Sequence, residues 1–270
     1  MKKSVKKALH AVGLLAPVQQ IYFNARTLTP SIALHELKLS THGAPDGYPL
    51  PPPRMVFDVI ACRWRAVYQV SGQLIADDLA SILSEAGHPL RSFSHILDFG
   101  CGCGRLTRQL PSRTDAQIAG SDLNPDLSGW CADNLPFGRF CTNDLLPPLE
   151  FGPHAFDLII ARSVFTHLPE PEQLAWMREF ERVLAPGGLI YLTMHGEQLA
   201  SGLTPSQRQI LENDELVVTY AALAGDNICS TWASRGYVER RLLEGFELLK
   251  HVPGRSATHL RQDVYVLQRS

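Results

Sequence analysis

From residue 95 onward, short apolar runs alternate with longer amphipathic segments. The apolar runs predict β-strands at 95–99, 117–121, 139–142, 156–161 and 188–194. Helical spacing lies between them, most clearly from Glu172 to Leu184, before the turn residues "APGG". Nearly continuous apolar strands separated by helices are typical of a parallel sheet with helices on both faces. The pattern therefore predicts an α/β fold.

The end of the chain departs from this alternation. Two strand-like runs, 245–252 and 262–269, follow each other without a helix between them, which predicts an antiparallel hairpin at the sheet edge. Before them, residues 196–243 are longer than a simple crossover requires. Within this stretch, residues 226–242 read as a short strand followed by a helix. We expect 196–243 to form a cap-like insertion over an acceptor pocket.

The first 54 residues predict a helical extension and a linker. Residues 2–16 have an apolar helical stripe and four lysines, Lys2, Lys3, Lys6 and Lys7. This helix either packs on the main domain or rests on an anionic membrane surface. Residues 40–54 are rich in Pro and Gly and predict a linker, and two helices with a break near Ser71-Gly72 follow. The predicted organisation is an extension over 1–54 and one domain over 55–270.

Composition narrows the range of partners. The chain has 270 residues and a formal net charge of −2, which gives no general reason to expect nucleic acid as a partner. Its six cysteines are scattered and none forms a C-x-x-C pair, so we expect a reducing, cytoplasmic compartment. No run approaches the roughly 18 apolar residues that span a bilayer. Contact with the inner membrane surface is therefore expected only through residues 2–16.

The segment "DFGCGCGR" is the clearest chemical signal. Its alternating glycines and cysteines fit either a thiol or metal site, or a backbone loop that approaches a ligand closely. Asp98 ends a predicted strand and a helix is expected to begin at 105–110, so unpaired N–H groups would face an anionic or nucleoside ligand. The dinucleotide pattern G-x-G-x-x-G fails, because Arg105 is its sixth position. Asp122, after the next strand, either binds two ribose hydroxyls or caps the helix that follows.

Together these segments resemble the class I S-adenosylmethionine-dependent methyltransferases. "ILDFGCGCGR" is similar to their first motif, "IAGSDLNP" to their second-strand acid, and "FDLIIARSVFTHLPE" and "EFERVLAPGGLIYLTMHG" to the regions around the fourth and fifth strands. The resemblance covers about residues 90–195, and 245–270 by topology alone. It is closest to small bacterial enzymes that act on metabolites, lipids or glycans. It implies a Rossmann-like seven-stranded sheet of order 3-2-1-4-5-7-6, with strand 7 antiparallel, and S-adenosylmethionine as cofactor.

The resemblance also implies which residues contact the cofactor. Asp98 and the 100–104 backbone would surround its methionine part, Asp122 would bind the ribose, and the residues after the third strand would meet the adenine. The implied cofactor-binding residues are Tyr68, Asp98, Gly100, Cys101, Gly102, Gly104, Asp122, Leu123, Asn143, Asp144, Leu145, Arg162 and Ser163. Asn143 and Asp144 are also ordinary turn residues, and Tyr68 also fits an interfacial core aromatic.

Two histidines follow neighbouring predicted strands, where open α/β sheets bind ligands. His167 and His195 are candidates for a general base that takes a proton from an alcohol acceptor, although His167 also fits a structural loop residue. Trp64, Arg65, Trp232 and Arg235 are candidate acceptor contacts, or else core aromatics and solvated charges. No metal-ligand constellation is evident, so transfer without a metal is predicted.

The leading interpretation is an enzyme that transfers a methyl group from S-adenosylmethionine to an oxygen of a small molecule, lipid or glycan precursor. Nitrogen and carbon acceptors stay open. The alternatives are a catalytically silent cofactor-binding scaffold or regulatory subunit and, less favoured, an NAD-dependent oxidoreductase. Nucleic acid is disfavoured, because "ARSV" stands where amino-methylating enzymes have an N-P-P-Y-type loop.

Overall fold

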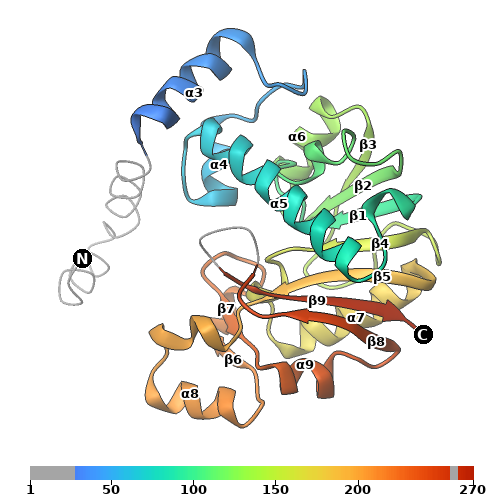
Figure 1. Ribbon diagram of the computed structural model, residues 1–270. Coiled ribbons are helices and arrows are strands. Elements are labelled where there is room, and N and C mark those ends of the chain that lie inside the picture. The colour runs from blue at the N-terminus through green and yellow to red at the C-terminus, as the bar shows by residue number, and fades with distance from the viewer. Residues whose placement is uncertain (1–27, 256–260) are drawn as a thin grey trace. The chain divides into compact units, whose positions relative to one another are not determined.

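The computed structural model describes residues 28–255 and 261–270 (Figure 1). The chain divides into two compact units, 1–72 and 73–270. The predicted amphipathic helix at 2–16, and with it the proposed membrane contact, lies outside the described residues. No helix in the described ranges is long and apolar enough to cross a bilayer.

The first unit contains helices α3 (Pro30–His42), α4 (Pro53–Ile60) and the start of α5 (Arg65–Glu85). The linker predicted over 40–54 is shorter in the structure, because α3 extends to His42 and α4 begins at Pro53. The predicted break near Ser71-Gly72 is wrong, because α5 runs through it. The break lies at 61–64, where Ala61 adopts a left-handed φ of 53° and ends α4. A glycine inside a helix lowers the free energy of unfolding by only about 1 kcal/mol. The burial of the apolar side chains of α5 contributes more than this to stability.

The second unit contains a seven-stranded sheet. Its strands are β1 (His95–Phe99), β2 (Gln117–Asp122), β3 (Gly138–Thr142), β4 (Phe156–Ala161), β5 (Leu184–Met194), β8 (Phe246–Val252) and β9 (Asp263–Arg269). Their order is β3-β2-β1-β4-β5-β9-β8, and β9 runs antiparallel to both neighbours. Because β8 and β9 are the sixth and seventh strands of this sheet along the chain, the predicted order 3-2-1-4-5-7-6 and the terminal hairpin are confirmed.

Both faces of the sheet are buried, as the apolar runs predict. Successive residues of β4 alternate between two core clusters: Ile159 belongs to the first, whereas Leu158 and Ile160 belong to the second. The first cluster contains side chains of α7 (Glu170–Val183) and α9 (Arg235–Arg241), and the second contains side chains of α5. Helix α6 (Pro125–Asn134) contacts β2 and β3. The Rossmann-like α/β class is therefore confirmed.

The stretch 196–243 folds as a small substructure between β5 and β8. It contains η4 (Glu197–Gly202), α8 (Pro205–Glu212), β6 (Val217–Thr219), η5 (Ala221–Leu223), β7 (Ser230–Trp232) and α9. Strands β6 and β7 form a separate antiparallel pair (Figure 1). The predicted short strand followed by a helix corresponds to β7 and α9. The short helices η1 (Leu90–Ser92), η2 (Thr107–Gln109) and η3 (Phe165–His167) complete the second unit.

The prediction of a helix at 105–110 is wrong. In its place the chain forms turns and the single 3₁₀ turn η2. The physical reason is Pro111, which has no N–H to bond to the Thr107 carbonyl and so cannot extend an α-helix through this segment. The loop after β1 is therefore built from tight turns and not from the first turn of an α-helix.

Candidate functional site

The segment Gly100–Gly104, here called the glycine loop, passes over the carboxyl ends of β1 and β2. Gly100, Gly102 and Gly104 have φ values of 74°, 57° and 79°, in the left-handed region that favours glycine. The N–H groups of Gly100 and Cys101 donate to the Ser121 carbonyl at 2.8 and 3.0 Å. A Cβ on Gly100 would collide with Val164, just after β4. The backbone conformation of the loop thus requires glycine, whereas the cysteines contribute their backbone and small volume.

Asp122 fastens the glycine loop to the end of β2. Its Oδ2 accepts from the Gly102 N–H at 2.7 Å and its Oδ1 from the Asn124 N–H at 2.9 Å. The N-cap of α6 is Asn124, whose side chain accepts from Asp126, so the alternative of Asp122 as helix cap is wrong. Burial raises the pKa of Asp122, and the two backbone donors counteract this rise. The carboxylate lies at the carboxyl edge of the sheet, and its role in ribose binding stays a prediction.

A buried acid and two guanidinium groups lie beside the loop. Asp98, at the end of β1, is buried and accepts from the Thr107 hydroxyl at 2.5 Å. Burial raises the pKa of Asp98 to about 6, although Arg105 and Arg162 favour its charged form. Burial and the nearby Arg105 lower the pKa of Arg162 to about 9. One carboxyl and two guanidiniums match the ammonium and carboxylate of an amino-acid ligand.

The residues after β3 offer a buried acceptor. The Asn143 N–H donates to the Asp122 carbonyl at 3.1 Å, and its Nδ2 donates to the Asp144 carbonyl at 2.8 Å. Asn143 Oδ1 is buried and has no donor in the described ranges. The Leu145 carbonyl accepts from Trp176 Nε1 at 2.9 Å, which fixes the turn. An unpaired buried oxygen next to the exposed Asp144 fits the amino group of an adenine.

Ser163 follows β4 in an unusual backbone conformation, with φ at 59°. Its N–H donates to Thr193 Oγ1 at 2.8 Å, and its hydroxyl donates to Gln262 Oε1 at 2.7 Å. Thr193 also donates to Gln262 Oε1, at 2.8 Å. This network holds the turn after β4 to β5 and to the residue before β9. Gln262 was not predicted from the sequence, because no local motif marks it. Only the antiparallel pairing of β9 with β5 brings it to the turn after β4.

The two predicted histidines lie against the same strand of the insertion. His167 Nδ1 lies 2.7 Å from the Cys229 carbonyl, and His195 Nδ1 lies 3.0 Å from the Thr231 carbonyl. Because a carbonyl only accepts, each Nδ1 carries the proton and each Nε2 has a lone pair. Burial lowers the pKa of His167, and burial together with a charge on His167 lowers the pKa of His195 to about 4. Both imidazoles are therefore neutral near pH 7.

The insertion also contacts the residues predicted to hold the adenine. The Gly225 N–H donates to the His167 carbonyl at 2.9 Å. A Cβ on Gly225 would lie 2.7 Å from Leu123 Cδ2 and 3.0 Å from Leu145 Cδ1. Together with the Gly100–Val164 contact, these interactions bring the loops after β1, β2, β3 and β4 and the insertion to one edge of the sheet.

Thiol chemistry is not needed to explain the glycine loop. None of the six cysteines forms a disulfide. Cys101 and Cys131 both donate to the Gly102 carbonyl, at 3.6 and 3.4 Å. The contact with Cys131, followed by burial, holds the pKa of Cys101 well above its usual value. Such thiols are poor nucleophiles. Within the described ranges, no three His, Cys, Asp or Glu side chains are grouped so as to hold a metal ion.

The methyltransferase domain family matches residues 96–188, which run from β1 into β5 and include the glycine loop and Asp122. Residues 96–188 therefore carry the signature of a methyltransferase domain. S-adenosylmethionine is the cofactor of such domains. The orphaned Asn143 oxygen and the glycine-only turns of the loop fit this group.

Comparison with curated and solved proteins agrees with this assignment. Malonyl-[acyl-carrier protein] O-methyltransferase of Porphyromonas gingivalis is 31% identical over 125 residues, 45% of this chain and 45% of that protein. This chain thus spans less than half the length of that curated relative. An S-adenosylmethionine-dependent methyltransferase from Mesorhizobium loti has a TM-score of 0.55 at 16% identity, covering 72% of this chain and all of the other. Magnesium protoporphyrin IX methyltransferase from Synechocystis, solved with bound SAH, has a TM-score of 0.51 at 20% identity, covering 76% and 87%. These two structures share the methyltransferase fold.

The remaining predicted residues of the methyltransferase lie in other settings. Trp232, on β7, has its ring centroid 5.5 Å from that of His195. Arg235 pairs with Glu239 at 2.7 Å on the exposed side of α9. Arg65 pairs with Glu36 at 2.8 Å within the first unit, where the half-buried Trp64 and the buried Tyr68 also lie. The roles of Trp64, Arg65 and Tyr68 at the cofactor or acceptor stay predictions.

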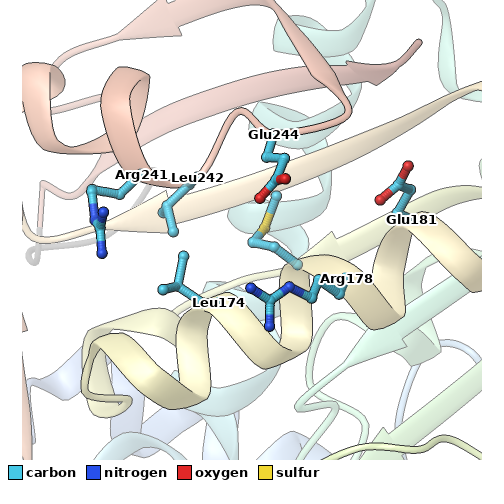
Figure 2. Close-up of a pocket in the computed structure, with 7 residues that line it drawn as sticks. Leu174, Arg178, Glu181, Arg241, Leu242 and Glu244 are labelled. Atoms are coloured by element: carbon cyan, nitrogen blue, oxygen red, sulfur yellow. The ribbon is translucent and has the colours of Figure 1, made fainter.

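A separate cavity of about 220 Å³ lies in the methyltransferase domain between α7 and the residues that follow α9 (Figure 2). Its apolar lining comes from Leu174, Met177 and Leu242, and arginine and glutamate side chains surround it. None of the glycine-loop residues and neither histidine lines it. It is therefore distinct from the cofactor site.

Proposed function

We propose that the protein is a methyltransferase that transfers the methyl group of S-adenosylmethionine to an oxygen of a small molecule, lipid or glycan precursor. The observation that carries this proposal is the pair of imidazole Nε2 lone pairs of His167 and His195 at the same sheet edge as the glycine loop. A neutral imidazole near a methyl donor is suited to remove the proton of a hydroxyl acceptor.

Residues at the ends of four strands, β1 to β4, would hold the cofactor. Asp98 and the guanidiniums of Arg105 and Arg162 supply opposite charges for the ammonium and carboxylate of its methionine part. Asp122 accepts from the ribose hydroxyls through lone pairs not used by the loop, and the Asn143 oxygen accepts from the adenine amine. When bound, S-adenosylmethionine supplies an electrophilic methyl group on a sulfonium. The residues of this chain orient it and keep the reacting centre in line with the acceptor.

His167 is the stronger candidate for the base. Its Nδ1–H donates to the Cys229 carbonyl and its own carbonyl accepts from Gly225, so the ring is fixed from both sides. His195, with Trp232 beside it, would line the acceptor pocket and provide a second lone pair. General-base assistance of this kind contributes about 10²- to 10⁴-fold to a rate.

The contacts of the insertion with the two histidines also support the domain limits predicted from the sequence. We infer that residues 55–270 act as one catalytic domain and that 196–243 is its cap, because the carbonyls of Cys229 and Thr231 in that segment bond to both histidines. The O-methyltransferase name of the Porphyromonas gingivalis relative supports an oxygen acceptor.

Deleting residues 2–16 and measuring liposome binding tests the proposed membrane contact; unchanged binding would eliminate it.

Two measurements test the proposed activity. Calorimetric titration with S-adenosylhomocysteine and with NAD is expected to show binding of the first and not the second; the reverse would indicate an oxidoreductase. Incubating the protein with isotope-labelled S-adenosylmethionine and a cell extract, followed by mass spectrometry, is expected to yield S-adenosylhomocysteine and a labelled product with the methyl group on oxygen. Cofactor binding without any turnover would identify a silent scaffold instead.

A further inference from the structure

Exposed apolar side chains gather on the loops at the site end of the sheet. The large hydrophobic residues that are exposed in this region, here called the apolar rim, are Leu123, Leu146, Tyr220, Leu223 and Ile228. Two of them follow β2 and β3, and three lie between β6 and β7. In the described part of the second unit, the other exposed large hydrophobics are Leu74 and Ile210. Most of the apolar exposure of this unit therefore lies on loops next to the cofactor site.

The apolar rim is tied directly to the proposed base. The segment 225–229 bonds to His167 at both of its ends, through the Gly225 N–H and the Cys229 carbonyl. Leu223 and Ile228 lie within two residues of these anchors. Gly225 also packs against Leu123, so the rim residues after β2 and those of the insertion meet at one place.

Hydrogen bonds fix the exposed positions of these side chains. The Asp226 N–H donates to the Leu223 carbonyl at 3.0 Å, and the Asp226 carbonyl accepts from the Cys229 N–H at 3.0 Å. The Asp226 carboxylate accepts from the Ile228 N–H at 2.8 Å. Ile228 is 55% exposed and Leu223 43% exposed within this bonded turn. The fold holds apolar groups in water at this place, which is typical of a binding surface.

We propose that the acceptor is amphiphilic, with its nucleophilic oxygen directed to His167 and an apolar hydrocarbon chain lying on the part of the apolar rim that the insertion contributes, Tyr220, Leu223 and Ile228. This inference rests on the proposed function and narrows its substrate to the class of acyl- or prenyl-chain compounds. The continuity of the rim with His167 favours one molecule that occupies both. The hydrocarbon gains affinity with each methylene that it buries, by about threefold to fourfold.

The test uses straight-chain primary alcohols from hexanol to decanol as probes, with the full-length chain saturated with S-adenosylhomocysteine. Calorimetry is expected to show tighter binding with chain length, by about threefold to fourfold per methylene. The double variant Leu223→Ser/Ile228→Ser is expected to lose this dependence. The matched control Ile210→Ser removes an exposed isoleucine on α8, outside the rim, and is expected to keep it.

Several outcomes would overturn the proposal. One is affinity that does not change with chain length, and another is an equal loss in Ile210→Ser. A third is rim-dependent binding of phosphatidylcholine vesicles without binding of the alcohols, which would make the rim a membrane-docking surface. S-adenosylhomocysteine affinity, measured first on the wild type and both variants, separates this test from the proposed function. Absence of that binding in the wild type contradicts the methyltransferase activity, whereas normal binding with a flat alcohol series contradicts only the apolar chain.

Discussion

The Gly102 N–H donates to the Asp122 carboxylate at 2.7 Å, and this bond joins the two parts of the chain that a nucleoside cofactor must contact together. Asp122 thus has two functions in the structure. It holds the glycine loop in its left-handed turns, and we propose that its remaining lone pairs bind the ribose hydroxyls. The loop and the acid form one bonded unit, so a change in either is expected to affect both.

Asp122→Asn is expected to weaken S-adenosylhomocysteine binding by about 10- to 100-fold, because charge-assisted hydrogen bonds of roughly 1.5–3 kcal/mol become neutral or are lost. Calorimetry measures the affinity. Asp133→Asn, an exposed acid on the adjoining helix α6, serves as the control and is expected to bind within twofold of the wild type. Equal affinity in Asp122→Asn would show that this acid does not bind the ribose.

Glycine and cysteine variants of the loop are expected to behave differently. Gly100→Val or Gly102→Val places a β-branched side chain at a left-handed φ, and at Gly100 also against Val164, which costs about 1–3 kcal/mol. Cofactor affinity is expected to fall at least about tenfold in either variant. Cys101→Ala and Cys103→Ala are expected to retain affinity within about threefold, since only their backbones face the ligand. A large loss in both folded cysteine variants would instead indicate sulfur chemistry.

The sequence predicted the sheet well because its strands are buried on both faces. Runs such as 156–161 need no partner to be recognised, and β1 and β4 have the predicted bounds. β5 is longer than predicted, since Leu184 already pairs with Phe156 across a register shift in front of the "PGG" turn residues. The prediction of a helix after the glycine loop was wrong because Pro111 follows the loop closely. The proline is visible in the sequence, but the family pattern favoured a helix at this place.

The candidate site was predictable only where its residues follow strands directly. Asp98 and Asp122 lie in the last two residues of β1 and β2, His195 directly follows β5, and His167 ends the short helix η3 after β4. The groups that fix the histidine tautomers are backbone carbonyls 62 and 36 residues away, in an insertion without a motif. A backbone carbonyl can belong to any residue type, so the bonds from Cys229 and Thr231 to the two rings could not be predicted.

Cofactor affinity is expected to depend on pH through Asp98. Its pKa is raised by burial to about 6, so the carboxylate that pairs with an ammonium exists mainly above pH 6. S-adenosylhomocysteine binding is therefore expected to weaken as pH falls from 7 to 5, approaching tenfold per pH unit below the pKa. Unfolding through Asp98 is not the cause, because a raised pKa means that the folded state binds this proton more tightly than the unfolded state. Calorimetry across this range, with Asp98→Asn as the control that flattens the dependence, checks the prediction.

Methyl transfer is expected to proceed without a bound metal. The proposed chemistry uses imidazole bases and backbone donors, and no step calls for a Lewis acid. Once an acceptor is known, initial rates after dialysis against EDTA are expected to lie within twofold of untreated enzyme. A loss that added Mg²⁺ or Zn²⁺ restores would contradict this expectation and require metal ligands from outside the described residues or from the acceptor itself.

The histidine pair gives a prediction that needs no acceptor. Because each Nδ1–H donates to a carbonyl, ¹⁵N NMR of the imidazoles is expected to show the Nδ1-protonated tautomer for both His167 and His195 at pH 7. His195 is expected to stay neutral until about pH 4, since burial disfavours its charged form.

With an acceptor, His167→Asn is expected to lower kcat about 10²- to 10⁴-fold with little change in S-adenosylhomocysteine affinity. His95→Asn, an exposed histidine at the opposite end of β1, controls for the substitution. An Nε2-protonated His167, or an unchanged kcat in His167→Asn, would exclude it as the base.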